Sequence, residues 1–152
     1  MCPIMVGEDR IVQEVVIMAP AERIFRALTR PEELLQWWVA EDKFHLIEAE
    51  CDLQPGGKWR MRVAGRCAAG SPVSTVFGEY RDVEPPRLLT YTWIRENENW
   101  PETLVRWDLK EANGFTTVRV THSGLVSEAM RERNSGWPVV LKLLEHFVDQ
   151  SS

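Results

Sequence analysis

The sequence predicts an α+β fold in which an antiparallel sheet is wrapped around a C-terminal helix. Between Phe44 and His122 apolar and polar residues alternate with period two, and Pro- and Gly-rich breaks divide this stretch into short strands. No helical pattern between those strands is long enough to form a crossover, so we expect neighbouring strands to run antiparallel. From Trp137 onward the apolar period becomes helical.

The first part of the chain predicts one strand followed by two short helices. Residues 11–17 are apolar and β-branched, which is typical of a strand. Pro20 suits the first turn of a helix, and Pro31 suits the first turn of a second helix that runs to Trp37-Trp38. Thr29 followed by Glu32 fits a capping box for that second helix. Six further strands follow, so the sequence predicts seven.

Strand alternation assigns one face of the sheet to apolar and aromatic side chains, because successive residues of a strand point to opposite faces. The residues expected on this face are Trp59, Met61, Val63, Leu89, Tyr91, Trp93, Val105, Trp107, Leu109, Val118, Val120 and His122. The final helix carries one apolar stripe of Trp137, Val140, Leu141, Leu144, Phe147 and Val148. Only the apolar sheet face is large enough to bury that stripe, so helix and sheet should pack together.

Pro138 predicts a break just before the final helix. A proline inside a helix lacks a donor and crowds the carbonyl four residues earlier, here that of Asn134. Gly136 adds conformational freedom at the same place. We therefore expect a kink or a new helix start between Asn134 and Trp137.

Composition excludes several classes of function. The 152 residues, 44% hydrophobic and 27% charged, are typical of one soluble domain, spanning residues 1–152 with a core of about residues 11–149. A net charge of -5 gives no positive field that would attract nucleic acid. No apolar run approaches the roughly 20 residues of a membrane-spanning helix, and no signal-peptide pattern is present. We expect a cytoplasmic protein without membrane insertion.

Cysteine and histidine spacing predicts neither a disulfide framework nor a metal site. Cys2, Cys51 and Cys67 are odd in number and lack CxxC spacing, so we interpret them as free thiols. The three histidines share no ligand spacing with one another or with a cysteine. We expect no metal, and the absence of a dinucleotide fingerprint favours no organic cofactor.

Several short motifs follow one another in an order that resembles a known family. They are Ala19-Pro20-Ala21-Glu22-Arg23-Ile24-Phe25, Trp37-Trp38, Pro55-Gly56-Gly57-Lys58-Trp59, the segment 84–93, Thr121-His122-Ser123-Gly124 and Gly136-Trp137. In this order, over roughly residues 11–149, they resemble the START-like (SRPBCC) superfamily, and within it the bacterial homologues of the heat-shock-chaperone ATPase activator.

That resemblance implies a single START-like domain with the helix-grip fold of the birch-pollen allergens. In this fold a curved antiparallel sheet surrounds a long C-terminal helix, two short helices follow the first strand, and a cavity often holds an apolar ligand. Members of the superfamily include lipid and polyketide carriers, polyketide cyclases and chaperone co-activators. The fold therefore does not imply one function.

Together, the residues and the resemblance predict a protein that binds a small hydrophobic or aromatic molecule between the sheet and the C-terminal helix. The ligand-binding residues that we expect are Trp38, Trp59, Met61, Tyr91, Trp93, Trp107, His122, Trp137 and Leu141. The alternative is a filled core, because side chains this bulky can pack solid. His122 has two interpretations, a hydrogen-bonding group for the ligand or a satisfied histidine at a strand end.

Covalent chemistry has little support in the sequence. No nucleophile elbow, phosphate-binding loop or zinc-protease motif is present, so we assign no catalytic residue. A polyketide cyclase-like enzyme is the first alternative, and it needs an ionisable group in the cavity. Glu79 and Arg81 are the candidates for that group, and their other interpretation is a solvated outer face. A chaperone-interacting protein is the second alternative, and homodimerisation stays open.

Overall fold

The computed structural model describes residues 10–40, 44–65, 73–96, 99–134 and 136–151. Within them, eight strands form one sheet in the order β1-β8-β7-β6-β5-β4-β3-β2, and every neighbouring pair is antiparallel. The strands are β1 (Arg10–Ile17), β2 (Val39–Ala40), β3 (Phe44–Cys51), β4 (Lys58–Gly65), β5 (Val73–Glu84), β6 (Leu88–Arg95), β7 (Thr103–Ala112) and β8 (Phe115–Ser123). The strand that the sequence did not predict is the two-residue β2, which pairs with β3.

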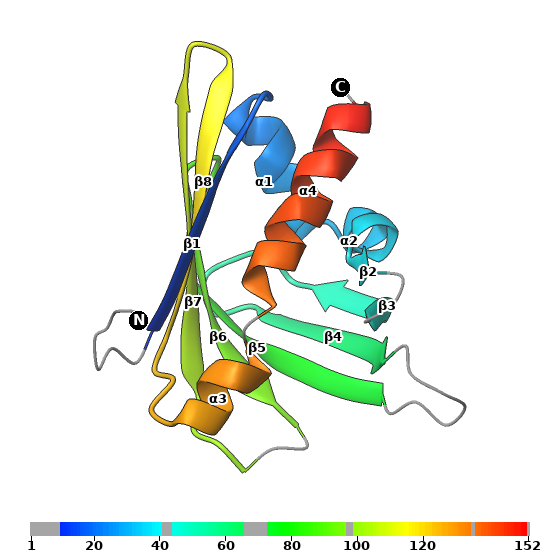
Figure 1. Ribbon diagram of the computed structural model, residues 1–152, viewed down its shortest axis with the longest axis vertical. Helices are drawn as coiled ribbons and strands as arrows, with labels where there is room; N and C mark the ends of the chain where they lie inside the picture. Colours follow the sequence, from blue (N-terminus) through cyan, green and yellow to red (C-terminus); the bar gives the residue numbers. More distant parts are fainter. Residues whose placement is uncertain (1–9, 41–43, 66–72, 97–98, 135, 152) are drawn as a thin grey trace.

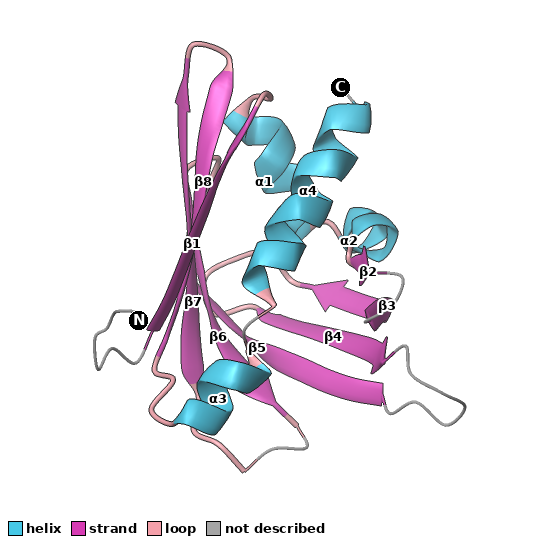
Figure 2. Cartoon of the chain, in the orientation of Figure 1, coloured by secondary structure: helices cyan, strands magenta, loops and turns pink. Residues whose placement is uncertain are grey.

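The helices of the described residues lie on the concave side of this sheet. They are α1 (Ala21–Thr29), α2 (Pro31–Trp37), α3 (Glu128–Arg133) and α4 (Trp137–Ser151). Figure 1 shows the sheet curving around α4, with α1 and α2 toward one end of the concave side and α3 at the other. Figure 2 shows the same separation of helices from strands. The arrangement confirms the expected α+β helix-grip fold, and no helix described here is long and apolar enough to cross a membrane.

Strand alternation predicted the inner face correctly. Its residues on β6, β7 and β8 are buried, and on β4 only Val63 remains half-buried. On the outer face Thr90 and Thr92 are also buried, because their hydroxyl groups accept the backbone N–H groups of Asp82 and Glu79. Those two donors lie where the pairing of β5 with β6 becomes irregular. The threonines thus satisfy N–H groups beside a bulge.

The capping box expected for α2 is wrong. Thr29 is the last residue of α1, and its hydroxyl donates to the carbonyl of Phe25 at 2.9 Å. The N-cap of α2 is Arg30, whose side chain makes no capping bond. A threonine inside a helix can donate its hydroxyl to the carbonyl four residues earlier, and the Thr29 hydroxyl that does so is not used to cap α2. The first N–H group of α1 has an acceptor that is distant in the sequence. Glu111 of β7 accepts the N–H of Ala21 at 2.8 Å.

The break before the final helix is confirmed. Helix α3 ends at Arg133 and α4 begins at Trp137, which places Pro138 in the first turn of α4. The N–H of Val140 donates to the carbonyl of Gly136 at 3.0 Å, so the helical bonding starts there. In a first turn the missing N–H of proline has no helical partner to lose. The apolar stripe of α4 faces the sheet, with only Phe147 half-buried.

Gly78 of β5 should tolerate no side chain. It lies opposite Trp59, whose indole N–H donates to the carbonyl of Thr92, and an added Cβ would stand 2.0 Å from that carbonyl oxygen. We expect Gly78→Ala to lower the free energy of unfolding by about 1–3 kcal/mol, the usual cost of overpacking. Urea denaturation measures this. Gly136→Ala is the matched control, because its Cβ would meet no atom within 4 Å. An equal effect of both changes would contradict the assignment.

Candidate functional site

The nine residues predicted to bind ligand come together on the concave side of the sheet, and we call this set the aromatic inner face. Every one of them is 9% exposed or less. Trp38 follows α2, Trp137 and Leu141 belong to α4, and the others lie on β4, β6, β7 and β8. The structure thus joins residues from five elements, together with Trp38, on one buried face.

The rings of the aromatic inner face contact one another in a continuous series. The ring centroids of Trp59 and Tyr91 lie 5.0 Å apart, and those of Trp59 and Trp93 lie 5.5 Å apart. Trp137 continues the series, because its ring centroid lies 5.6 Å from that of Trp93, 5.8 Å from that of Trp107 and 6.2 Å from that of Trp38. These separations fall within the range of favourable aromatic pairs. Much of the inner face is therefore occupied by ring-to-ring packing.

Four of the five indole groups in this face donate to acceptors of the protein itself. The acceptors are the carbonyl of Thr92 for Trp59 at 3.1 Å, Asn134 Oδ1 for Trp93 at 3.2 Å, the hydroxyl of Tyr91 for Trp107 at 2.9 Å and His122 Nδ1 for Trp137 at 3.1 Å. A buried indole needs such a partner. Sequence patterns placed Tyr91 and His122 on the same face as the tryptophans but predicted none of these hydrogen bonds.

His122 has both ring nitrogens bonded within the protein. Because an indole N–H only donates, Nδ1 must accept from Trp137, and the ring proton therefore resides on Nε2. Nε2 donates to Thr103 Oγ1 at 2.8 Å, and that hydroxyl donates to the carbonyl of Trp93 at 3.0 Å. Burial lowers the pKa of His122 from 6.5 to about 3, and the charge of Arg95 acts in the same direction. The ring is neutral at physiological pH and ties α4 to β8.

The tyrosine and cysteine side chains of the inner face are neutral as well. Burial raises the pKa of Tyr80 and of Tyr91, and burial also raises the pKa of the free thiol of Cys51. Cys51 and Tyr80 share a hydrogen bond. Cys2 and Cys67 lie outside the described residues. At neutral pH these groups therefore offer weak neutral donors and acceptors, and the charge beside this face is the guanidinium of Arg95, 5.6 Å from the centroid of the Trp93 ring.

One side of the inner face is incompletely covered. Ala49, Cys51 and Val63 are half-buried, and Ala49 and Cys51 stand directly opposite Met61 and Trp59 in the pairing of β3 with β4. We call these three residues, together with Trp38, the open margin.

Trp38 joins the open margin through Leu46, whose N–H donates to the carbonyl of Trp38 and which lies opposite Val63. Within the described residues, the indole N–H of Trp38 has no protein acceptor. No buried side-chain nitrogen or oxygen there lacks a partner, so this N–H must reach the solvent. Trp38 thus carries an unused hydrogen-bond donor, and its backbone is joined to the strand that carries the half-buried residues.

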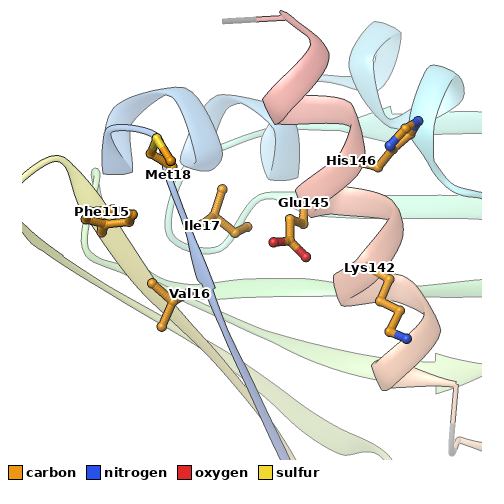
Figure 3. Close-up of a pocket in the computed structure, with 7 residues that line it drawn as sticks. All are labelled: Val16, Ile17, Met18, Phe115, Lys142, Glu145 and His146. Carbon is orange, nitrogen blue, oxygen red and sulfur yellow. The ribbon is translucent and has the colours of Figure 1, made fainter.

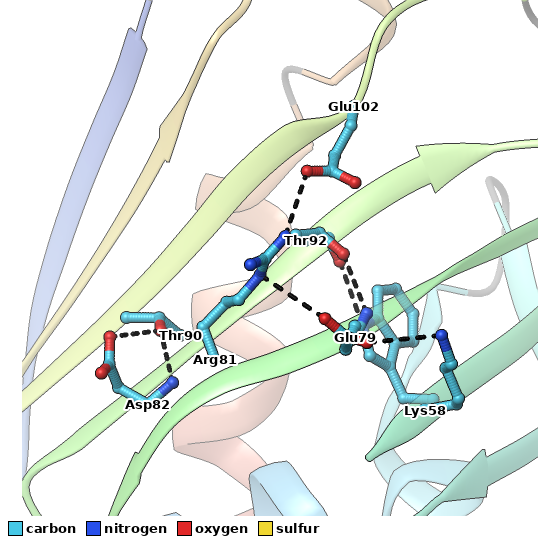
Figure 4. A network of polar contacts seen from close by, with 8 residues as sticks. Lys58, Glu79, Arg81, Asp82, Thr90, Thr92 and Glu102 are labelled. Carbon is cyan, nitrogen blue, oxygen red and sulfur yellow. Dashed lines mark hydrogen bonds and ion pairs between the residues drawn. The ribbon is translucent and has the colours of Figure 1, made fainter. Parts of the chain in front are cut away.

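Glu79 and Arg81, the candidates for an ionisable group in the cavity, lie on the outer face instead. Figure 4 shows them on the side of the strands away from α4. Glu79 pairs with Lys58 at 3.4 Å, and Arg81 pairs with Glu102 at 3.4 Å. Similar ion pairs are Arg60–Glu48, Arg60–Glu50 and Arg62–Glu48 between β4 and β3, and Arg119–Glu14 between β8 and β1. Of the two alternatives for Glu79 and Arg81, the structure therefore supports a solvated position on the outer face.

A second concave feature, the β1–α4 groove, lies between the end of β1 and α4. It has a volume of about 550 Å³ and is lined by Val16, Ile17, Met18, Phe115, Lys142, Glu145 and His146. Figure 3 shows Val16 and Phe115 on the strand side and the three polar side chains on α4. Val16, Met18 and Phe115 are exposed. The side chains of the three polar residues make no ion pair or hydrogen bond within the described part of the chain. Sequence reasoning did not predict this groove.

Sequence patterns also did not predict the roles of Asn134 and Thr103, although each forms a hydrogen bond with a buried aromatic side chain. Neither belongs to a motif, and Asn134 was treated only as the carbonyl crowded by Pro138. The signal that could have found them is the requirement that every buried tryptophan or histidine have a hydrogen-bond partner. That requirement says that a partner exists, but its position depends on the tertiary fold.

His122 should make stability depend on pH. Its folded pKa of about 3 lies below the unfolded value of 6.5, so its contribution is fully present above pH 6.5 and is lost as pH falls toward 3. The slope approaches about 1.4 kcal/mol per pH unit. We expect His122→Gln to be less stable at pH 7 and to lose less stability between pH 7 and 5 than the parent, as measured by urea unfolding. Parallel pH profiles would contradict this.

Solved structures show the same fold at low sequence identity. Protein CV1439 from Chromobacterium violaceum has a TM-score of 0.80 and 23% identity, over 92% of this chain and 96% of that one. CalU16 from Micromonospora echinospora has a TM-score of 0.68 and 24% identity, over 91% and 75%. The AHSA1-like protein from Aeromonas hydrophila has a TM-score of 0.74 and 20% identity, over 93% of each chain. No curated protein matches the chain.

The family comparison covers nearly all of the predicted core. The model described as "Activator of Hsp90 ATPase homolog 1-like protein" matches residues 18–149. This range includes both short helices, the inner-face residues of β4 to β8 and the stripe of α4. The chain therefore belongs to the family of Activator of Hsp90 ATPase homolog 1-like proteins.

Proposed function

We propose that this protein binds a small hydrophobic or aromatic molecule between the sheet and α4, at the open margin of the aromatic inner face. The observations that carry the proposal are a half-buried apolar strip on β3 and β4 and, in the residue joined to β3 through Leu46, an indole donor of Trp38 that has no acceptor within the described part of the chain. Small-molecule sites combine mostly apolar walls with a few polar groups that fix orientation. Trp59 and Met61, opposite the half-buried residues of β3, supply the wall.

The chemistry of the margin selects an uncharged ligand with a hydrogen-bond acceptor. The nearby Cys51 and Tyr80 are neutral, so no ion pair is offered to a charged group. A flat molecule with a carbonyl or ether oxygen can lie on the apolar strip and accept the N–H of Trp38. Tyr91 lies against Trp59 and extends this wall. The proposal needs no metal and no organic cofactor.

The remaining predicted residues form the packed side of this site. They are Trp93, Trp107, His122, Trp137 and Leu141. A ligand reaches them only where a hydrogen bond within the protein gives way. The cyclase-like alternative needs an ionisable group beside the ligand. Glu79 and Arg81 lie on the outer face, and the histidine, tyrosine and cysteine side chains of the inner face are neutral, so none of them is an ionised acid or base, and binding is favoured over catalysis.

Two adjacent tryptophans give a matched test of the site. We expect saturable quenching of tryptophan fluorescence by a member of a panel of flavonoids, aromatic polyketides and fatty acids. Trp38→Phe should weaken binding of a carbonyl-bearing ligand about 2–10-fold, the effect of one lost hydrogen bond, and should lower stability only through the smaller buried ring. The indole of Trp37 donates to the carbonyl of Ala27 at 2.9 Å, so Trp37→Phe should lower stability and leave affinity unchanged. Quenching by no compound, or equal affinities of the two variants, would contradict the proposal.

The β1–α4 groove favours a second candidate function, the docking of a chaperone. Family membership supports a chaperone partner, and exposed Val16, Met18 and Phe115 provide an apolar surface beside Lys142 and Glu145. Protein interfaces often combine an apolar centre with a polar rim. In this candidate function the partner is an Hsp90-type chaperone, and the protein raises its ATPase activity.

Substitutions in the groove test that second candidate. We expect the parent protein to stimulate the ATPase activity of purified Hsp90, and Met18→Glu and Phe115→Glu to abolish the stimulation, because each buries a charge in the apolar contact. Val126→Glu is the control, since Val126 is exposed but does not line the groove. No stimulation by the parent, or an equal loss with Val126→Glu, would exclude docking at this groove.

A further inference from the structure

Helix α3 is a short element between two interruptions of the chain. It has six residues, follows the loop after β8 and ends just before the break that precedes α4. Figure 1 shows it across the end of the concave side opposite α1 and α2. A helix this short is not stable by itself, so tertiary contacts must hold it in place.

Two residues connect α3 to the rest of the described structure. The side chain of Met130 is 2% exposed, which anchors the helix by apolar burial. Asn134, 5% exposed, accepts the indole N–H of Trp93 at 3.2 Å and Arg95 Nε at 2.9 Å with its single Oδ1. Its Nδ2 donates to the carbonyl of Met130 at 2.8 Å. One side chain thus joins the end of α3 to β6.

The other side-chain hydrogen bonds of this segment are local. Ser127 accepts the N–H of Met130 at 3.2 Å, and Arg131 donates to the carbonyl of Leu125 at 2.8 Å. These bonds shape α3 but do not connect it to the sheet. Of the described side chains in this segment, Asn134 is the one that bonds to a strand of the inner face.

The opposite end of the concave side is held by more interactions. Glu33 of α2 pairs with Arg23 of α1 at 2.7 Å and with Arg26 at 3.2 Å, and the indole of Trp37 donates to the carbonyl of Ala27. Glu111 of β7 also holds the first N–H of α1. Opening at α1 and α2 would break all of these bonds, whereas among the side chains that the structure describes in and after α3, opening there breaks the bonds of Asn134 to β6.

Asn134 also lies at the edge of the most enclosed part of the aromatic inner face. The Trp93 ring that it holds lies 5.5 Å from His122 and 5.6 Å from Trp137. Trp137, three residues after Asn134, begins α4 and donates to His122. Displacement of α3 would therefore expose Trp93 first and loosen the first turn of α4 next.

We propose that α3 is a cover over this end of the aromatic inner face and that Asn134 is the latch that holds it closed. Opening of the latch gives a small molecule access to Trp93, His122 and Trp137, which are closed in the structure described here. The inference rests on the proposed ligand-binding function only in saying that the opening admits a ligand. The opening itself is a property of the free protein and is measured without any ligand.

Hydrogen exchange of the indole N–H groups, followed by NMR, tests the latch. In the parent protein the indole protons of Trp93 and Trp137 should exchange faster than those of Trp59 and Trp107, because α3 opens without global unfolding. Asn134→Ala should accelerate exchange of Trp93 and Trp137 at least about tenfold, beyond any change at Trp59 and Trp107. Asn134→Asp keeps an acceptor for Trp93 and Arg95, so slow exchange should be restored relative to Asn134→Ala.

Tyr91→Phe is the matched control, because it removes the acceptor of the Trp107 indole, which lies on the sheet and not on α3. It should accelerate the exchange of Trp107 without selectively affecting Trp93 and Trp137. If Asn134→Ala changes all four indoles by the same factor, or changes none, the latch is overturned. If the selective effect is found but no compound of the ligand panel binds, the cover stands and the proposed function fails.

Discussion

The structure depends on burying its tryptophans while giving their N–H groups acceptors. An indole contributes a large apolar surface, but an unpaired buried donor costs about as much as that burial gains. The hydrogen bond from Trp137 to His122 is central, because it joins the first turn of α4 to β8 and fixes the tautomer that bonds Thr103. The same burial that these bonds permit lowers the pKa of His122 and keeps its ring neutral.

Periodicity in the sequence predicted the parts of the fold that depend on local pattern. Alternation placed Trp59, Trp93 and Trp107 on one face, and Pro138 with Gly136 located the break before α4. The acceptors could not be predicted, because Asn134 lies 41 residues from Trp93 and the two meet only in the folded chain. Local pattern also misassigned Thr29, whose hydroxyl had a nearer acceptor within its own helix. Glu79 stayed ambiguous because the irregular pairing of β5 lies close to it.

The candidate site was predicted less completely than the fold, for a physical reason. Strand parity distinguishes the inner from the outer face, but it does not distinguish a ring that packs against other rings from one with a free edge. Trp37 and Trp38 are neighbours in the sequence, yet one donates to a carbonyl and the other retains an unused donor. Solved structures at 20–24% identity share the fold, but that similarity does not tell a packed ring from a ring with an unused donor. Function in this family therefore has to be argued from individual side chains.

The ion pairs of the outer face have a consequence for strand register. A one-residue slip of an edge strand turns its apolar side chains to solvent and is strongly disfavoured, whereas a two-residue slip keeps every side chain on its own face. In β1 the outward Val12 and Val16 are alike and do not distinguish these two alignments. Glu14 does, because it stands directly opposite Arg119 of β8 and bonds to it at 2.9 Å. A surface pair that adds little to stability can in this way select one alignment of the edge strand from two that bury the same face.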